Sequence, residues 1–181
     1  MFKVICLLVA GLFAVVLAAP YTYDTEHNWI KGNLSIPLTS DVIVGGFDPY
    51  GYRTYIGRVA YDTNVLPARV VAETGYAYFN TDKLSNKLVD YQLLTSSPSF
   101  DFEWIRSFDG NYEKGAVSVG TTHWNERVFI CRARADGGLL MGTLFLSQKY
   151  CIIKNEDLPL RHFDKYEILV AKSKANSTCK A

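Results

Sequence analysis

The sequence of 181 residues is poor in the residue types and motifs that carry out catalysis. Its only histidines, His27, His123 and His162, are at unrelated positions. It contains no H-E-x-x-H, G-x-S-x-G, phosphate-loop or C-x-x-C motif. No set of His, Cys, Asp or Glu has the spacing of a metal site. We therefore predict a protein that is not an enzyme and that needs no metal and no cofactor.

Charge of one sign and long apolar runs are also scarce. The formal net charge is +1, which gives no reason to expect nucleic acid or an acidic membrane as a partner. One apolar run, Val4–Leu17, follows Lys3 and is short for a membrane span. Small residues at Val16 and Ala18 predict a signal peptide over residues 1–18, with a signal anchor as the alternative. We expect a secreted, extracellular protein without membrane insertion.

Cysteine is sparse for a secreted chain. Cys6 lies in the predicted signal peptide, so three cysteines remain, Cys131, Cys151 and Cys179. Because an oxidising compartment favours pairing, one of them is left unpaired or available for a bridge in a homodimer. Two N-glycosylation motifs begin at Asn33 and Asn176.

An internal repeat organises what is present. The stretch Val42–Val71 matches Ala116–Phe145 without a gap at a constant offset of 74 residues. The match extends outward with one added residue on each side, through Trp29/Trp104 and the block Tyr91–Leu94, which pairs with Tyr166–Leu169. We place a first copy at residues 19–97, a degenerate second copy at 98–171 and a polar tail at 172–181.

Short strands and frequent turns characterise both copies. No segment has a sustained helical period, although residues 82–90 could form one helical turn. In the first copy we expect strands at 41–44, 54–60, 68–72, 75–79 and 89–94, with Pro67 at the start of the third. The fold class is all-β: two tandem, pseudo-symmetric, antiparallel β repeats in one domain.

The repeat alignment also predicts a disulfide. Cys131 and Cys151 stand where the first copy has the small residues Gly57 and Ala77. If these positions face each other on neighbouring strands, a pair of small residues fits where a disulfide fits. We predict a Cys131–Cys151 bond.

Several blocks resemble the DM-nine repeat, the lectin-like module also found at the start of natterin-type toxins. They are Trp29, the block VIVGGxD at 42–48, YIGRV at 55–59, LPARV at 66–70 and DYQLL at 90–94. The resemblance implies two intertwined β repeats, recognition of mannose-type glycans and, in some members, a role in innate immunity.

The resemblance also implies site residues. An Asp after the glycine pair and a Lys in the Leu-Pro-Ala-Lys block hold sugar hydroxyls in such lectins; the positions here are Asp48 and Arg69. Tyr50 could supply an aromatic face beside them. The alternative is that Asp48 only caps a turn and Arg69 is a surface charge. In the second copy the equivalent residues are Thr122 and Thr143, so we expect sugar binding by the first copy alone.

A further set of residues is the same in both copies and is predicted to be structural. Arg58 and Arg132 lie among strand hydrophobes, and we expect them to pair with Asp62 and Asp136. Recurring tryptophans predict core positions, at Trp29 and Trp104.

Two functions compete with glycan binding. Fourteen per cent aromatic residues and a mature chain of about 160 residues would also suit a secreted β carrier of small apolar ligands. A pore-forming role, as in natterins, is disfavoured because the chain has no second module for insertion.

Overall fold

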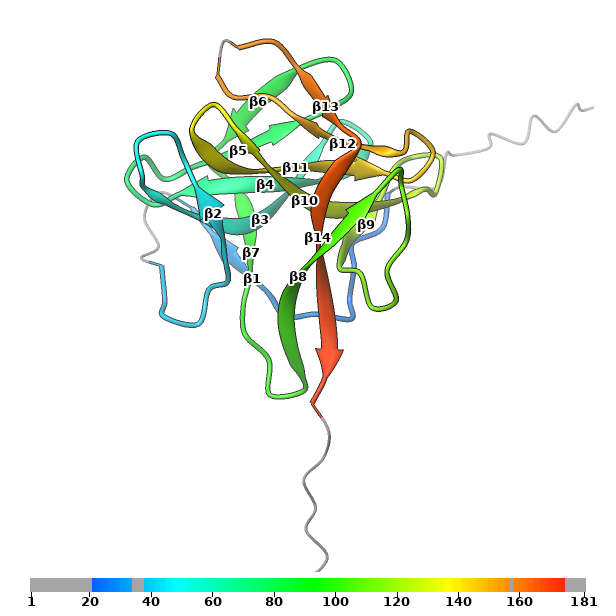
Figure 1. Ribbon diagram of the computed structural model, residues 1–181. Helices are drawn as coiled ribbons and strands as arrows, with labels where there is room; N and C mark the ends of the chain where they lie inside the picture. Colours follow the sequence, from blue (N-terminus) through cyan, green and yellow to red (C-terminus); the bar gives the residue numbers. More distant parts are fainter. Residues whose placement is uncertain (1–20, 34–37, 157, 175–181) are drawn as a thin grey trace, which may run out of the picture.

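The computed structural model describes residues 21–33, 38–156 and 158–174, which form one antiparallel sheet of fourteen strands (Figure 1). The predicted signal peptide, Asn176 and Cys179 lie outside the described residues. The strands of the first copy are β1 (Trp29–Gly32), β2 (Val44–Phe47), β3 (Arg53–Tyr61), β4 (Asn64–Val71), β5 (Tyr76–Asn80), β6 (Ser85–Leu88) and β7 (Tyr91–Leu94). Those of the second are β8 (Phe100–Phe108), β9 (Ser118–Thr121), β10 (Arg127–Ala135), β11 (Gly138–Phe145), β12 (Tyr150–Ile153), β13 (Arg161–Phe163) and β14 (Lys165–Ser173). Among the described residues, no helix is long and apolar enough to cross a membrane.

The two copies have the same strand pairing. In the first, β1 pairs with β7, β7 with β3, and β3 with both β2 and β4, followed by β5 and β6. In the second, β8, β14, β10, β9, β11, β12 and β13 repeat this scheme strand for strand. The all-β prediction is confirmed, and the internal repeat in the sequence corresponds to a repeat in the fold.

The copies are joined through their strands and through a common core. β2 of the first copy pairs with β11 of the second at Phe47 and Leu139. In Figure 1, β4 and β11 lie in the middle of the molecule, and the long strands β8 and β14 run side by side. The larger cluster of buried side chains takes residues from both copies, for example Ile56 and Val65 with Ile130 and Leu169. Neither copy therefore buries its apolar surface alone.

Cys131 and Cys151 form a disulfide with their Cα atoms 5.9 Å apart, the pairing expected from the repeat alignment. The prediction assumed that the two cysteines lie on neighbouring strands, and this is wrong: β11 lies between their strands and pairs with both β10 and β12. A Cβ at Gly142 of β11 would lie 2.2 Å from the carbonyl oxygen of Ile152. The missing side chain thus lets β12 fold closely over β11, toward β10.

Several expected element bounds are wrong. Residues 82–90 contain strand β6 and no helical turn, because β6 pairs with β5 at the sheet edge. The strand expected at 41–44 is β2, at 44–47. Pro67 lies inside β4, opposite Arg58; it is tolerated there because β5 pairs with β4 only from Ala68 onward. β14 runs to Ser173, into the expected polar tail, because it pairs with β8 over its whole length.

Candidate functional site

A pocket of about 150 Å³ lies in the first copy, where the loop between β2 and β3 meets β4 and β5. It contains all three residues that the sequence predicted for sugar binding. A segment of the second copy, after β12, completes its wall. The lining residues are Asp48, Pro49, Tyr50, Tyr52, Arg69, Val71, Glu73, Thr74, Tyr78, Asn155 and Glu156.

Asp48 reaches the pocket through the turn that it caps. The N–H of Gly51 donates to the carbonyl oxygen of Asp48, which closes the expected turn. The Asp48 Oδ1 accepts the backbone N–H groups of Tyr50 and Tyr52, each at 2.9 Å. Within the described part of the chain no hydrogen bond uses Oδ2. One oxygen therefore orders the turn, and the other is free to accept a hydroxyl from a ligand.

Arg69 is not the surface charge of the alternative interpretation, because only 5% of it is exposed. Its Nη2 donates to Asn155 Oδ1 at 3.4 Å, and its guanidinium lies 5.6 Å from the centre of the Tyr78 ring. Its Nη1 is buried without a hydrogen-bond partner among the described residues. Burial lowers the pKa of Arg69, and the nearby Tyr78 and Asp48 oppose that shift.

An unpaired buried donor costs about 1–3 kcal/mol, so native proteins rarely leave one without an acceptor. Arg69 Nη1 is such a donor at the wall of a pocket. A ligand oxygen in the pocket would satisfy it. Tyr50, 77% exposed, and Tyr52, 51% exposed, stand at the rim, where aromatic faces can cover the apolar face of a sugar ring.

The second copy has the same backbone arrangement without the charges. Thr122 Oγ1 accepts the N–H groups of Trp124 and Glu126, each at 3.2 Å, as Asp48 does in the first copy. Thr143, at the position of Arg69, is fully buried and donates to the carbonyl oxygen of Asn80 at 2.8 Å. At these two equivalent positions, only the first copy therefore brings a carboxylate and a guanidinium into one pocket.

Arg58 is a structural residue, but its expected partner is wrong. Its Nε donates to Gln92 Oε1 at 2.8 Å, and its Nη1 donates to the carbonyl oxygens of Asp24 and Val119 at 2.8 and 2.9 Å. The guanidinium lies 4.3 Å from the Trp29 ring centre and 4.6 Å from that of Tyr23. Burial lowers the pKa of Arg58 to about 10, so the residue remains a cation at neutral pH.

Arg132 repeats this arrangement in the second copy. Its Nε pairs with Glu167 Oε2 at 2.6 Å, its Nη1 donates to the carbonyl oxygen of Gly45 at 2.9 Å, and it lies 4.1 Å from the Trp104 ring centre. Gly45 and Val119 are equivalent positions in the two copies. Each arginine therefore donates to the equivalent backbone position of the opposite copy. The two arginines hold the copies together reciprocally, and both tryptophans are half-buried against them.

Asp62 and Asp136 recur for a different reason from the one expected. They stand at the tips of the β3–β4 and β10–β11 hairpins with φ angles of 53° and 52°, a conformation that Asp and Asn tolerate better than most residues. Asp136 forms an ion pair with Arg161 and none with Arg132. The turns, and not the arginines, account for these aspartates.

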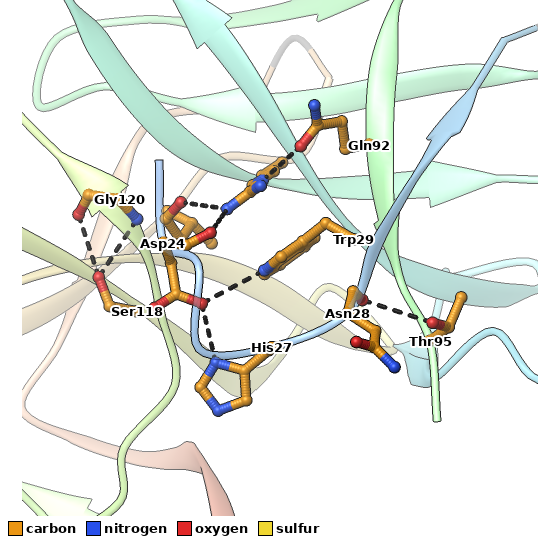
Figure 2. A network of polar contacts seen from close by, with 10 residues as sticks. Asp24, His27, Asn28, Trp29, Gln92, Thr95, Ser118 and Gly120 are labelled. Carbon is orange, nitrogen blue, oxygen red and sulfur yellow. Dashed lines mark hydrogen bonds and ion pairs between the residues drawn. The ribbon is translucent and has the colours of Figure 1, made fainter. Parts of the chain in front are cut away.

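Sequence reasoning missed the segment before β1, because it has no counterpart in the repeat. Figure 2 shows the buried side chains of Asp24 and His27 in contact, with Asp24 also reached by Trp29. His27 Nδ1 lies 2.8 Å and Trp29 Nε1 3.4 Å from Asp24 Oδ2. Asp24, Glu26 and His27 offer ligand atoms within 4.8 Å of one another. Asp24 and His27 are already hydrogen-bonded to each other, so we assign no metal there.

Asn33, the first predicted glycosylation position, is half-buried directly after β1. Its glycosylation stays a prediction.

The fold is that of a duplicated all-β module in which one copy has a pocket lined by Asp48 and the buried Arg69. Residues 48–162 match the family model of the DM9 repeat, and the chain belongs to that family. Among solved structures, it is similar to the crystal structure of the nematode sperm cell motility protein MFP2B, with a TM-score of 0.65 and 14% sequence identity. The match covers 88% of this chain and 50% of that one, so the chain spans about half its length and the likeness concerns the fold alone. No curated protein matches the chain.

Proposed function

We propose that this protein is a secreted lectin whose first copy binds a mannose-type sugar in the pocket beside Asp48. The observation that carries the proposal is the buried Arg69 donor without a partner, at the wall of a pocket that also holds a carboxylate. A pair of sugar hydroxyls could donate to Asp48 Oδ2 and accept from Arg69 Nη1. The family resemblance supports the choice of mannose-type glycans and a role in innate immune recognition.

The predicted signal peptide supports secretion, and a disulfide suits an oxidising compartment. A homodimer through Cys179 stays a prediction. A cleft of about 640 Å³ in the second copy has four cationic side chains on its wall, which does not favour the alternative of an apolar-ligand carrier.

The expected affinity of one pocket is low. Charge-assisted hydrogen bonds contribute about 1.5–3 kcal/mol each, and this small pocket holds few of them. A free energy of about 4 kcal/mol corresponds to a dissociation constant on the millimolar scale. Several protein molecules on one glycan surface would then be needed for firm attachment.

The second copy suggests a substitution that removes the carboxylate of Asp48 and keeps the turn that Asp48 caps. Asp48→Thr copies Thr122, whose hydroxyl caps the equivalent turn of the second copy. Asp48→Ala would leave two N–H groups without their acceptor and would confuse binding with stability. At Arg69, Arg69→Met removes the donors but retains most of the side-chain volume, and Arg69→Lys restores the charge of the family motif.

The experiment measures retention on mannose-coated beads together with a thermal melt of each variant. We expect Asp48→Thr and Arg69→Met to lose retention, Arg69→Lys to keep part of it, and Thr122→Ala to keep all of it while lowering the melting temperature slightly. Equal losses from the Thr122 and Asp48 variants would contradict a site in the first copy. Failure of the wild type to bind any glycan on an array would refute the lectin proposal.

A further inference from the structure

A cleft of about 640 Å³ lies in the second copy and is separate from the sugar pocket. Strands β8, β14 and β10 form its floor. The β8–β14 ladder places Arg106 opposite Glu167 and Phe108 opposite Lys165, and the β10–β14 ladder places Arg132 opposite the same Glu167. Arg134 follows two residues after Arg132, so it points to the same face. The remaining lining residues are Ser107, Ala133, Leu139 and Tyr166.

Positive charge in this cleft is only partly compensated. Glu167 is its single lining carboxylate, and it is bonded to Arg132. The other three cations, Arg106, Arg134 and Lys165, are exposed. They take part in none of the ion pairs or side-chain hydrogen bonds found among the described residues. Their charges are therefore available to a ligand.

The equivalent cleft of the first copy shows that the fold does not require this charge. That cleft is smaller, about 300 Å³, and has Lys31, Ala60 and Asp90 where the second has Arg106, Arg134 and Lys165. Lys31 and Asp90 there form an ion pair at 4.0 Å. Gln92 stands where the second copy has Glu167. The second copy thus has four cations and one carboxylate where the first has two cations and one carboxylate.

Arginine guanidinium groups match the paired oxygens of sulfate and phosphate, and several cations around one cleft favour a ligand with more than one such group. Phe108, 55% exposed, and Leu139 add apolar surface to the wall. We propose that this cleft binds a polyanionic ligand with sulfate or phosphate ester groups. Arg132, held by Glu167 and the Gly45 carbonyl, supplies a fixed wall, and the three exposed cations contact the ester oxygens.

Two probes distinguish the sources of this chemistry. Heparin octasaccharide carries sulfates on a sugar chain, and inositol hexakisphosphate carries phosphates on a small ring; unsulfated dextran of similar length is the neutral reference. We expect calorimetry of the full-length protein to show binding of at least one anionic probe, weakening as salt is raised. Each of Arg106→Gln, Arg134→Gln and Lys165→Gln should weaken it about tenfold, and the triple variant at least 100-fold.

A charge-matched control separates the cleft from net charge. The triple variant Lys31→Gln, Lys83→Gln, Lys114→Gln removes the same charge from exposed positions outside the cleft. It should change probe binding less than threefold. Equal weakening by both triple variants, or no binding of either anionic probe at low salt, would overturn the proposal. Asp48→Thr should leave anion binding unchanged, so failure of the lectin proposal and failure of this one are distinguishable.

Discussion

Removing the guanidinium of Arg58 should destabilise the protein strongly, because that group joins three parts of the chain. Arg58→Met keeps the apolar stem and leaves the carbonyl oxygen of Asp24 and Oε1 of Gln92 without their donor, whereas the Val119 carbonyl oxygen keeps the N–H of Asp24. Each buried unpaired acceptor costs about 1–3 kcal/mol, and the lost stacking on two rings adds about 1 kcal/mol. Relief of the buried charge offsets a part. We expect a net loss of about 3 kcal/mol, or roughly 6–12 °C in melting temperature.

The equivalent change in the second copy should cost less. Arg132→Met leaves one carbonyl, at Gly45, and the carboxylate of Glu167, whose side chain is 33% exposed and can be hydrated. We expect a loss of about 2 kcal/mol. Urea unfolding and thermal melts at neutral pH measure both, with Arg53→Met as the control. Arg53 is exposed, so this control should change stability by no more than about 0.5 kcal/mol.

Two outcomes would refute this reasoning. If Arg58→Met melts within 2 °C of the Arg53 control, the reciprocal arginines do not hold the copies together. If Arg132→Met costs more than Arg58→Met, burial does not set the order of the two effects.

Two more predictions concern the covalent link and the buried acid. Replacing both Cys131 and Cys151 by Ala should lower the free energy of unfolding by about 3 kcal/mol, since the bond closes a loop with a sequence separation of 20 residues; wild type in reductant should match the variant in a urea titration, and a difference above 1 kcal/mol would contradict this. Burial raises the pKa of Asp24, but the hydrogen bond and charge of His27, together with the hydrogen bonds from Trp29 and the Glu26 backbone, outweigh it, so the net pKa lies below the ordinary 3.8. Ionised Asp24 therefore contributes stability above about pH 4 that is lost as the pH falls through the lowered pKa. The stability difference between wild type and Asp24→Asn should shrink from pH 6 to pH 3, and a constant difference would argue against this linkage.

The internal repeat made much of the fold predictable, because equivalent positions in two copies must fit the same backbone. It predicted the disulfide, because Gly57 and Ala77 stand at the positions of Cys131 and Cys151, while the short strands and frequent turns of both copies predicted the all-β class. The side-chain partners of the two arginines could also have been predicted from the repeat, because Gln92 and Glu167 stand in the matched blocks directly after Tyr91 and Tyr166. Proximity in sequence favoured the turn aspartates instead.

Contacts between the copies were beyond the reach of the sequence. No local pattern shows that Arg69 meets Asn155, or that the carbonyl of Val119 accepts from Arg58. The segment around Asp24 has no second copy to compare with. The basic cleft depends on a ladder register that brings Arg106 and Arg134 to one face, and that register is a property of the folded sheet.

The two copies exchange hydrogen-bond partners as the subunits of a symmetric dimer do, although both belong to one chain. Arg69 reaches Asn155 in the other copy, and Thr143 reaches Asn80 in return. In a dimer of identical subunits, a change on one surface alters both sites at once. Fusion into one chain removes that constraint. One half is free to keep a small pocket with a carboxylate and a buried arginine, and the other to gather cations, while the junction that both need stays the same.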